Sequence, residues 1–227
     1  MTKGLKYTLI ALGAGVFLFI VFQGSQIAFA DVVSFNEVYP YVKKWSDYYH
    51  VPMALIYAIM QQETGGLSLT GHSKEYFRRN QPLMQNAIEV ASGGSQGLMQ
   101  ILYSNAQALG YTGTPAGLSD PDTGIEYGTA WLSGIINGSV GGVEVSGHSI
   151  DVTDVANIAA QYNDGKDYSK ATSSTRNTYV PNVLSFYNYY AIKLSQMGVS
   201  SPQAQALPAG ASGSVSTRLW DTMTGWL

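Results

Sequence analysis

The chain of 227 residues has no cysteine, few charged residues and no cluster of basic residues. The lack of cysteine excludes disulfides, thiolate zinc sites, iron–sulfur clusters, cysteine nucleophiles and lipid attachment through an N-terminal cysteine. Charged residues make up only 12% of the chain, which argues against long solvated helices and against disorder throughout. The 12 Lys and Arg residues are scattered among 15 Asp and Glu residues, so we expect no nucleic-acid partner.

The N-terminus has the pattern of an export signal. Lys3 and Lys6 precede an uncharged, largely apolar stretch over residues 7–30, and Ala28-Phe29-Ala30 has the small-x-small form of a cleavage site. The alternative is an uncleaved anchor, because roughly 20 predominantly apolar residues can span a bilayer. We favour cleavage. Under both interpretations the rest of the chain is exported to the periplasm or cell wall, and an uncleaved segment would hold it at the cytoplasmic membrane.

The exported part is predicted to be all-α. Apolar residues at helical spacing predict helices over residues 35–50, 52–63, 82–91, 104–109, 123–136, 153–162 and 181–197. Strand signals are weak, and the one candidate is Val143–Val145 in a glycine-rich stretch. We therefore expect a helical domain over residues 31–198, between a signal peptide or anchor (1–30) and a C-terminal region (199–227).

The C-terminal region combines a flexible linker with a short amphipathic segment. Residues 200–216 consist largely of Ser, Ala, Gly, Gln and Pro, as in flexible linkers. Apolar residues then recur at helical spacing within Val215–Leu227, which predicts a helix that docks on a protein partner or a membrane surface. The alternative is that this segment folds back into a groove of its own domain.

One carboxylate stands where its charged form is disfavoured. Glu63 follows Ile59 and Met60 on the apolar stripe of the 52–63 helix and also ends that helix. Burial and the negative end of the helix dipole both raise a carboxyl pKa, and a protonated glutamic acid is what general-acid catalysis needs. The alternative is a structural role, in which Glu63 bonds a neighbouring loop or pairs with Arg78 or Arg79.

Four sequence blocks resemble the soluble lytic transglycosylases, the lysozyme-like enzymes that cleave peptidoglycan. The blocks occur in the order found in that family, and they are residues 51–65 (VPMALIYAIMQQETG), 94–101 (GSQGLMQI), 158–165 (IAAQYNDG) and 178–184 (TYVPNVL). The segment 118–122 (LSDPD) and the helix after it also fit between the second and third blocks. The resemblance implies a lysozyme-like (goose-type) helical domain and peptidoglycan glycan strands as the substrate.

The resemblance also implies roles for individual residues. Glu63 is the expected catalytic acid, and the expected substrate-binding residues are Thr64, Gln96, Met99, Gln100, Tyr162, Asn163 and Tyr179. Within that set, Tyr162 is expected to hydrogen-bond Glu63, and Asn163 to hold the adjoining loop. Structural alternatives stay open for Met99 as a core residue and for Tyr179 as a residue packed on Tyr187.

Three departures from the family pattern limit what can be transferred. Thr64 replaces the usual Ser, and Gln161 and Asp164 flank Tyr162-Asn163 in place of the usual residues. The interval between Glu63 and Gln100 is about twice the usual one. The extra residues, roughly Leu67–Ile88, are predicted to form a lobe at the cleft rim with a short helix of its own, or else a solvated loop.

The chemistry implied by the resemblance needs one carboxylate. The remaining acidic residues are interpreted as helix caps and turn residues, including Asp120 and Asp122 before the 123–136 helix. The resemblance implies cleavage of the bond between N-acetylmuramic acid (MurNAc) and N-acetylglucosamine (GlcNAc) with formation of a 1,6-anhydro ring. We expect no metal and no cofactor, because the three histidines lack metal-ligand spacing and residues 163–167 read as a plain turn.

Two other functions stay open at this stage. A hydrolytic lysozyme of the same fold differs only in its products. A non-catalytic peptidoglycan-binding or virion-structural protein would keep the fold without the chemistry, and the intact Glu63, Gln100, Tyr162 and Asn163 argue against it. The sequence does not distinguish a phage particle, a secretion or conjugation system and wall turnover as the setting for local opening of the cell wall.

Overall fold

The structure is a computed structural model that describes residues 32–65, 67–68, 71–72, 75–78, 94–138, 150 and 152–199. The chain divides into two units, 1–31 and 32–227, and all described residues lie in the second. Five predictions fall outside the described residues: the signal or anchor, the 82–91 helix, the 143–145 strand, the linker and the C-terminal amphipathic segment. Within the described part, no helix is long and apolar enough to cross a membrane.

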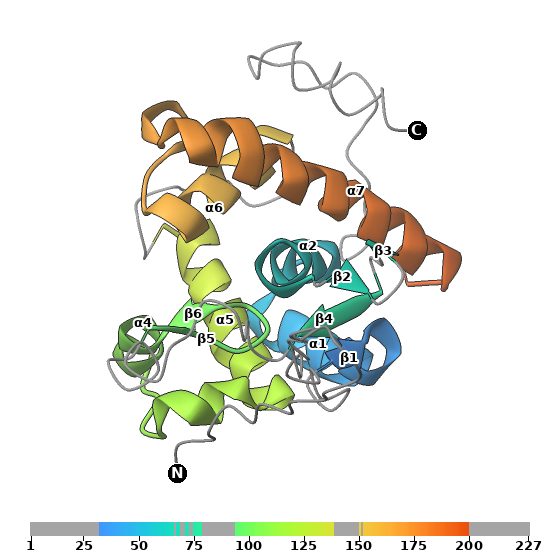
Figure 1. The fold of residues 1–227 in the computed structure, drawn as a ribbon, viewed down its shortest axis with the longest axis vertical. Helices are drawn as coiled ribbons and strands as arrows, with labels where there is room; N and C mark the ends of the chain where they lie inside the picture. Colours follow the sequence, from blue (N-terminus) through green and yellow to red (C-terminus); the bar gives the residue numbers. More distant parts are fainter. Residues whose placement is uncertain are drawn as a thin grey trace, which may run out of the picture. The chain divides into compact units, whose positions relative to one another are not determined.

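Helices dominate the described residues, which confirms the predicted all-α class (Figure 1). The α-helices are α1 (Phe35–Tyr49), α2 (Met53–Thr64), α4 (Tyr103–Ala108), α5 (Pro121–Ile136), α6 (Val152–Asp164) and α7 (Val180–Gln196). Two short 3₁₀ turns, η2 (Pro115–Ser119) and η3 (Tyr168–Lys170), and one π-helical turn, η4 (Thr175–Tyr179), lie between them. Each of these α-helices overlaps a predicted one to within a few residues.

Three short antiparallel strand pairs accompany the helices, and the sequence analysis did not predict them. Strand β1 (Val32–Ser34) pairs with β4 (Tyr76–Arg78), β2 (Leu67–Ser68) with β3 (Gly71–His72), and β5 (Ser95–Gln96) with β6 (Ile101–Leu102). In the first pair Val33 lies opposite Phe77, and both side chains are buried. The region between Glu63 and Gln100 is therefore tied at β4 to the first strand of the domain. Its predicted short helix lies outside the described residues.

Helix α2 forms the centre of the core. Every residue from Met53 to Met60 is at most 1% exposed, so the helix is apolar on all sides, as a helix enclosed by others must be. Figure 1 shows α2 nearly end-on, with α7 running past it. Pro52 precedes its first turn and Gly65 follows its last. A helix buried along this length is held rigidly, and its last turn delivers Glu63 to the edge of the core.

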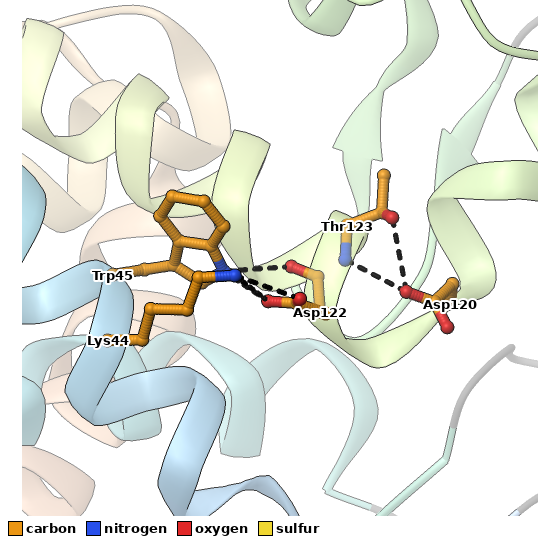
Figure 2. Close-up of polar contacts among 5 residues, drawn as sticks. All are labelled: Lys44, Trp45, Asp120, Asp122 and Thr123. Atoms are coloured by element: carbon orange, nitrogen blue, oxygen red, sulfur yellow. Dashed lines mark hydrogen bonds and ion pairs between the residues drawn. The ribbon is translucent and has the colours of Figure 1, made fainter.

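One acidic residue caps the N-terminus of α5, and a second fixes it to α1 (Figure 2). Asp120 caps the helix by accepting a hydrogen bond from the backbone N–H of Thr123 at 3.1 Å, which is the capping role predicted from the sequence. Asp122 in the first turn accepts a bond from the indole N–H of Trp45 at 2.6 Å and pairs with Lys44 at 3.0 Å. Acidic residues also favour the positive end of the helix dipole. These contacts hold α5, and with it one wall of the site, against α1.

Candidate active site

Glu63 lies in the last turn of α2, at the border between the core and a pocket. Burial raises the pKa of its carboxyl group to about 7, while a hydrogen bond from Tyr179 acts in the opposite direction. Burial dominates because removing a carboxylate from water penalises only its charged form. Glu63 is therefore partly protonated at neutral pH, and the sequence analysis anticipated this raised pKa from the position of Glu63 on the apolar stripe.

The hydroxyl group of Tyr179 donates a hydrogen bond to Glu63 Oε1 at 2.5 Å. Tyr179 is the last residue of the π-helical turn η4, and its side chain is only 8% exposed. Isolated π-helical turns are rare and are often found at functional sites. The structure thus brings together two residues that are 116 positions apart in the sequence, and Tyr179 contacts the carboxyl group directly.

A tight hairpin forms the opposite wall of the pocket. Residues 97–100 connect β5 to β6, and both Gly97 and Gln100 have positive φ angles, +69° and +48°. The backbone N–H and the side-chain amide of Gln100 both donate to the Gly97 carbonyl, at 3.1 and 2.8 Å. These bonds hold Gln100 in a conformation that non-glycine residues rarely adopt. A Cβ atom at Gly97 would lie 2.0 Å from the Leu118 carbonyl oxygen, so this position requires glycine.

The hairpin is joined to both neighbouring helices through its backbone carbonyls. The hydroxyl of Thr64 donates to the Leu98 carbonyl at 2.7 Å, and the hydroxyl of Tyr162 donates to the Met99 carbonyl at 2.7 Å. Thr64 directly follows Glu63, and Tyr162 lies on α6. These two bonds therefore fix the distance between the carboxyl group and the hairpin that faces it.

The pocket itself has a volume of about 210 Å³ and opens to solvent. Its described lining residues are Glu63, Ser95, Gln100, Ile101, Leu102, Asn105, Trp131, Tyr162 and Asn163. Glu63 is the single carboxylate in this set. Pockets that enclose a whole small ligand usually measure about 300–1,000 Å³, so this pocket fits part of a larger molecule.

The sequence of the site region matches one family. The family model for the transglycosylase SLT domain covers residues 40–182, well over half of the chain. The chain belongs to the transglycosylase SLT domain family. Comparison with individual curated proteins gives no match. The SLT domain is a lytic transglycosylase domain that acts on peptidoglycan, so the family resemblance read from the four sequence blocks is confirmed.

Four of the predicted site residues line the pocket of the SLT domain, and four do not. Glu63, Gln100, Tyr162 and Asn163 line it, whereas Thr64, Gln96, Met99 and Tyr179 are absent from its described lining. Tyr179 contacts Glu63 although it is absent from the described lining. The hydrogen bond to Glu63 that the resemblance assigned to Tyr162 is made by Tyr179, and the hydroxyl of Tyr162 donates to the Met99 carbonyl instead.

Gln96 and Met99 are buried, so their side chains are not among those that line the pocket in this structure. Gln96 is 1% exposed, and its side-chain amide lies 3.4 Å from the Gly94 carbonyl, within its own segment. Met99 is fully buried and its sulfur lies 3.9 Å from the hydroxyl of Thr129. A Cβ atom at Gly128 would lie 2.5 Å from that sulfur, so a glycine on α5 makes room for Met99. Met99 is therefore a core residue whose backbone, not its side chain, serves the hairpin.

Gln161 and Asp164, two residues that depart from the family motif, stabilise the segment after α6. Gln161 donates to Asp167 at 3.1 Å, and Asp164 accepts from the backbone N–H of Thr172 at 2.7 Å. Asn163 donates to the hydroxyl of Thr175 at 2.9 Å, a contact that holds the adjoining segment. These bonds fix residues 165–175, which lead directly into the π-helical turn carrying Tyr179.

The sequence analysis missed five of the described lining residues, Ser95, Ile101, Leu102, Asn105 and Trp131. Asn105 and Trp131 lie on α4 and α5, where their helical spacing gives no sign of which face meets the pocket. Ser95 belongs to a two-residue strand, which is too short to show alternation. Groups of three or more potential metal-ligating side chains are not found among the described residues.

Proposed function

We propose that this SLT domain cleaves the β-1,4 bond between MurNAc and GlcNAc and closes a 1,6-anhydro ring on MurNAc. The observation that carries this proposal is a protonated Glu63 as the single carboxylate among the described residues of the pocket. Glycosidases that use water ordinarily need a second carboxylate as nucleophile or base. A site with one carboxylate suits a reaction whose nucleophile belongs to the substrate.

Glu63 acts first as an acid and then as a base. Its carboxyl proton moves to the glycosidic oxygen as the bond from that oxygen to C1 of MurNAc breaks, and GlcNAc leaves as the free alcohol. The acetamido group of MurNAc stabilises the positive charge at C1. The C6 hydroxyl oxygen then bonds to C1, and its proton passes to the Glu63 carboxylate. Each cycle therefore returns Glu63 to its protonated form, and no water is consumed.

A pKa near 7 suits both steps. General acid–base catalysis is most efficient when the pKa of the group lies near the working pH, because neither protonation state is then strongly disfavoured. Tyr179 donates to Oε1, which directs the carboxyl proton to Oε2. Since the nucleophile is part of the bound sugar, the protein contributes mainly its orientation, and well-oriented intramolecular reactions gain several orders of magnitude in rate.

The setting of the reaction is also a proposal. We propose that residues 1–30 export the chain as a signal peptide or membrane anchor and that residues 31–198 form the enzyme, with residues 199–227 as linker and docking segment. The enzyme then acts in the periplasm or cell wall, where it opens peptidoglycan locally. The peptidoglycan substrate of the family and the export pattern of the N-terminus support this setting.

Replacing Glu63 by Gln tests the assignment, because the amide keeps the shape and removes the transferable proton. We expect release of soluble fragments from purified peptidoglycan to fall at least about 100-fold, with the circular dichroism spectrum unchanged. The matched control is Glu75→Gln, which removes an exposed carboxylate that pairs with Lys193 at 2.6 Å. Near-normal release by a folded Glu63→Gln variant would contradict the proposal.

A further inference from the structure

Aromatic side chains gather where the end of α1 meets α5. We name Trp45, Tyr48 and Tyr49 of α1, together with Tyr127 of α5, the α1–α5 aromatic patch, and the ring of Tyr127 itself contacts Tyr111 at 5.0 Å. The rings of Tyr48 and Tyr49 meet edge to face at 4.8 Å, and the Trp45 ring lies 5.8 Å from Tyr48 and 5.9 Å from Tyr49. Tyr48 is 69% exposed, the most of any large hydrophobic side chain described. The reaction proposed for Glu63 gives this cluster no role.

The patch is held in place by polar contacts behind the rings. The indole N–H of Trp45 donates to Asp122 at 2.6 Å, and Figure 2 shows this edge of the ring turned toward the first turn of α5. The ammonium group of Lys44 lies 4.0 Å from the centre of the Trp45 ring. The backbone carbonyl of Tyr49 accepts a bond from Ser133 at 3.0 Å. The Trp45 ring and the backbone at Tyr49 are therefore held in place, which lowers the entropy lost when this part of the patch binds a ligand.

The patch continues toward the pocket along α5. Tyr127 lies one helical turn before Trp131, which lines the pocket, so the two side chains share one face of the helix. Burial is the main cause of the raised pKa of Tyr49 and of Tyr127, and the charge of Glu126 is the second cause for both. Both phenols therefore lie near the same carboxylate. Trp131 and Tyr127 thus lead from the pocket wall along α5, and Glu126 lies between Tyr127 and Tyr49 at the end of α1.

The substrate extends beyond the pocket. Peptidoglycan glycan is a polymer, and the pocket of about 210 Å³ holds only a part of it. The faces of pyranose rings carry C–H groups that pack on aromatic rings, while their hydroxyl and acetamido groups bond to charged and polar side chains. Aromatic rings with Lys44, Asp122 and Glu126 at their margins offer both kinds of contact.

We propose that the α1–α5 aromatic patch is an accessory binding surface for a peptidoglycan glycan strand whose reacting bond lies at Glu63. This proposal rests on the proposed function for its substrate. A glycan is favoured over an anionic lipid surface because Lys44 is paired with Asp122 and Glu126 adds a further carboxylate, so these three groups carry no excess positive charge. The continuity through Trp131 favours the same strand over a separate ligand.

Binding to purified, insoluble peptidoglycan by full-length protein tests the proposal. All variants carry Glu63→Gln, so that the strand is not cut and binding is measured whether or not the enzyme is active. We expect Tyr48→Ala to weaken binding about three- to tenfold, the scale of one aromatic contact. Tyr48→Phe keeps the ring and should bind like the parent. Tyr76→Ala, which removes a 45% exposed tyrosine on β4, is the matched control and should also bind like the parent.

Equal binding by Tyr48→Ala and its parent would overturn the proposal. So would equal losses with Tyr48→Ala and Tyr76→Ala, which would indicate a non-specific surface effect. If Tyr48→Ala instead reduces association with vesicles of anionic phospholipid and leaves peptidoglycan binding unchanged, the patch is a membrane contact and the proposal is wrong. The thermal melt of each variant reports folding, and Tyr48→Gln, which also removes the ring, supplies the result if the alanine variant unfolds. The effect of Glu63→Gln on catalysis is measured in the separate activity assay. A failure of the proposed function therefore appears in the activity assay, and a failure of the patch proposal appears in the binding assay.

Discussion

Removing the hydroxyl group of Tyr179 should move the pH dependence of the enzyme. Tyr179→Phe keeps the ring, which is 8% exposed, and deletes the hydrogen bond to Glu63 Oε1. That bond lowers the pKa of Glu63 and so opposes the effect of burial. Without this bond, the charged carboxylate loses more stabilisation than the neutral carboxyl group does. The pKa of Glu63 therefore rises above about 7.

The size of the shift follows from the difference between the two protonation states. A hydrogen bond to a charged group contributes about 1.5–3 kcal/mol, roughly twice as much as a neutral one. The difference of about 1.4 kcal/mol corresponds to about one pKa unit. Because the acid must be protonated for the first step, the alkaline limb of kcat/KM should move from near pH 7 in the wild type to near pH 8 in Tyr179→Phe.

The assay is the initial rate of fragment release from peptidoglycan between pH 5 and pH 9 at subsaturating substrate. The matched control is Tyr57→Phe, which removes another buried hydroxyl that donates to the Phe35 carbonyl at 3.4 Å. We expect the control to keep the wild-type limb, even if its rate changes. An unshifted or acid-shifted limb in folded Tyr179→Phe would refute the reasoning that this hydroxyl stabilises the Glu63 carboxylate.

Two further predictions concern stability. The pKa of Glu63 in the folded protein is about 7, above its ordinary value of 4.5. The protonated carboxyl group therefore contributes its full share to the stability of the fold below pH 4.5, and this contribution is lost as the pH rises through 7. Between these limits Glu63→Gln should therefore gain up to about 3 kcal/mol relative to the wild type, measured by urea unfolding at pH 4.5 and pH 8, and a constant difference would contradict this. Gly97→Ala should destabilise the fold more than Gly110→Ala in the same assay. Both glycines have positive φ, but only at Gly97 would a Cβ atom collide with a backbone oxygen, that of Leu118. Equal losses would show that φ alone sets the effect.

Much of the helical framework could be predicted from the sequence, because helices of 12 or more residues carry a clear apolar period. Helix α1 is an example, because Val38 and Val42 recur at helical spacing on its buried face. Helix α2 is apolar on all sides, so its apolar run between Pro52 and Gly65 indicates it instead. Helix α5 also follows from local signals, with Asp120 as its cap. The raised pKa of Glu63 could be anticipated for the same reason, because it depends on helix position and burial.

The contacts between distant segments could not be predicted in this way. Which tyrosine bonds Glu63 depends on how α6 and η4 pack, and local patterns do not distinguish Tyr162 from Tyr179. Gln96 and Met99 appear in the family motif, yet the motif does not show that their side chains point into the core. The two- and three-residue strands were missed because alternation needs a longer stretch to be visible.

The measurement that tests the account most directly is mass spectrometry of the products released from purified peptidoglycan in isotopically labelled water. The account predicts muropeptides that end in 1,6-anhydro-MurNAc, one water lighter than the reducing form and free of label, because the C6 hydroxyl of the sugar is the nucleophile. Glu63→Gln should abolish these products. Labelled reducing ends from the wild type would contradict the account and show that the enzyme is a hydrolase in which water attacks C1.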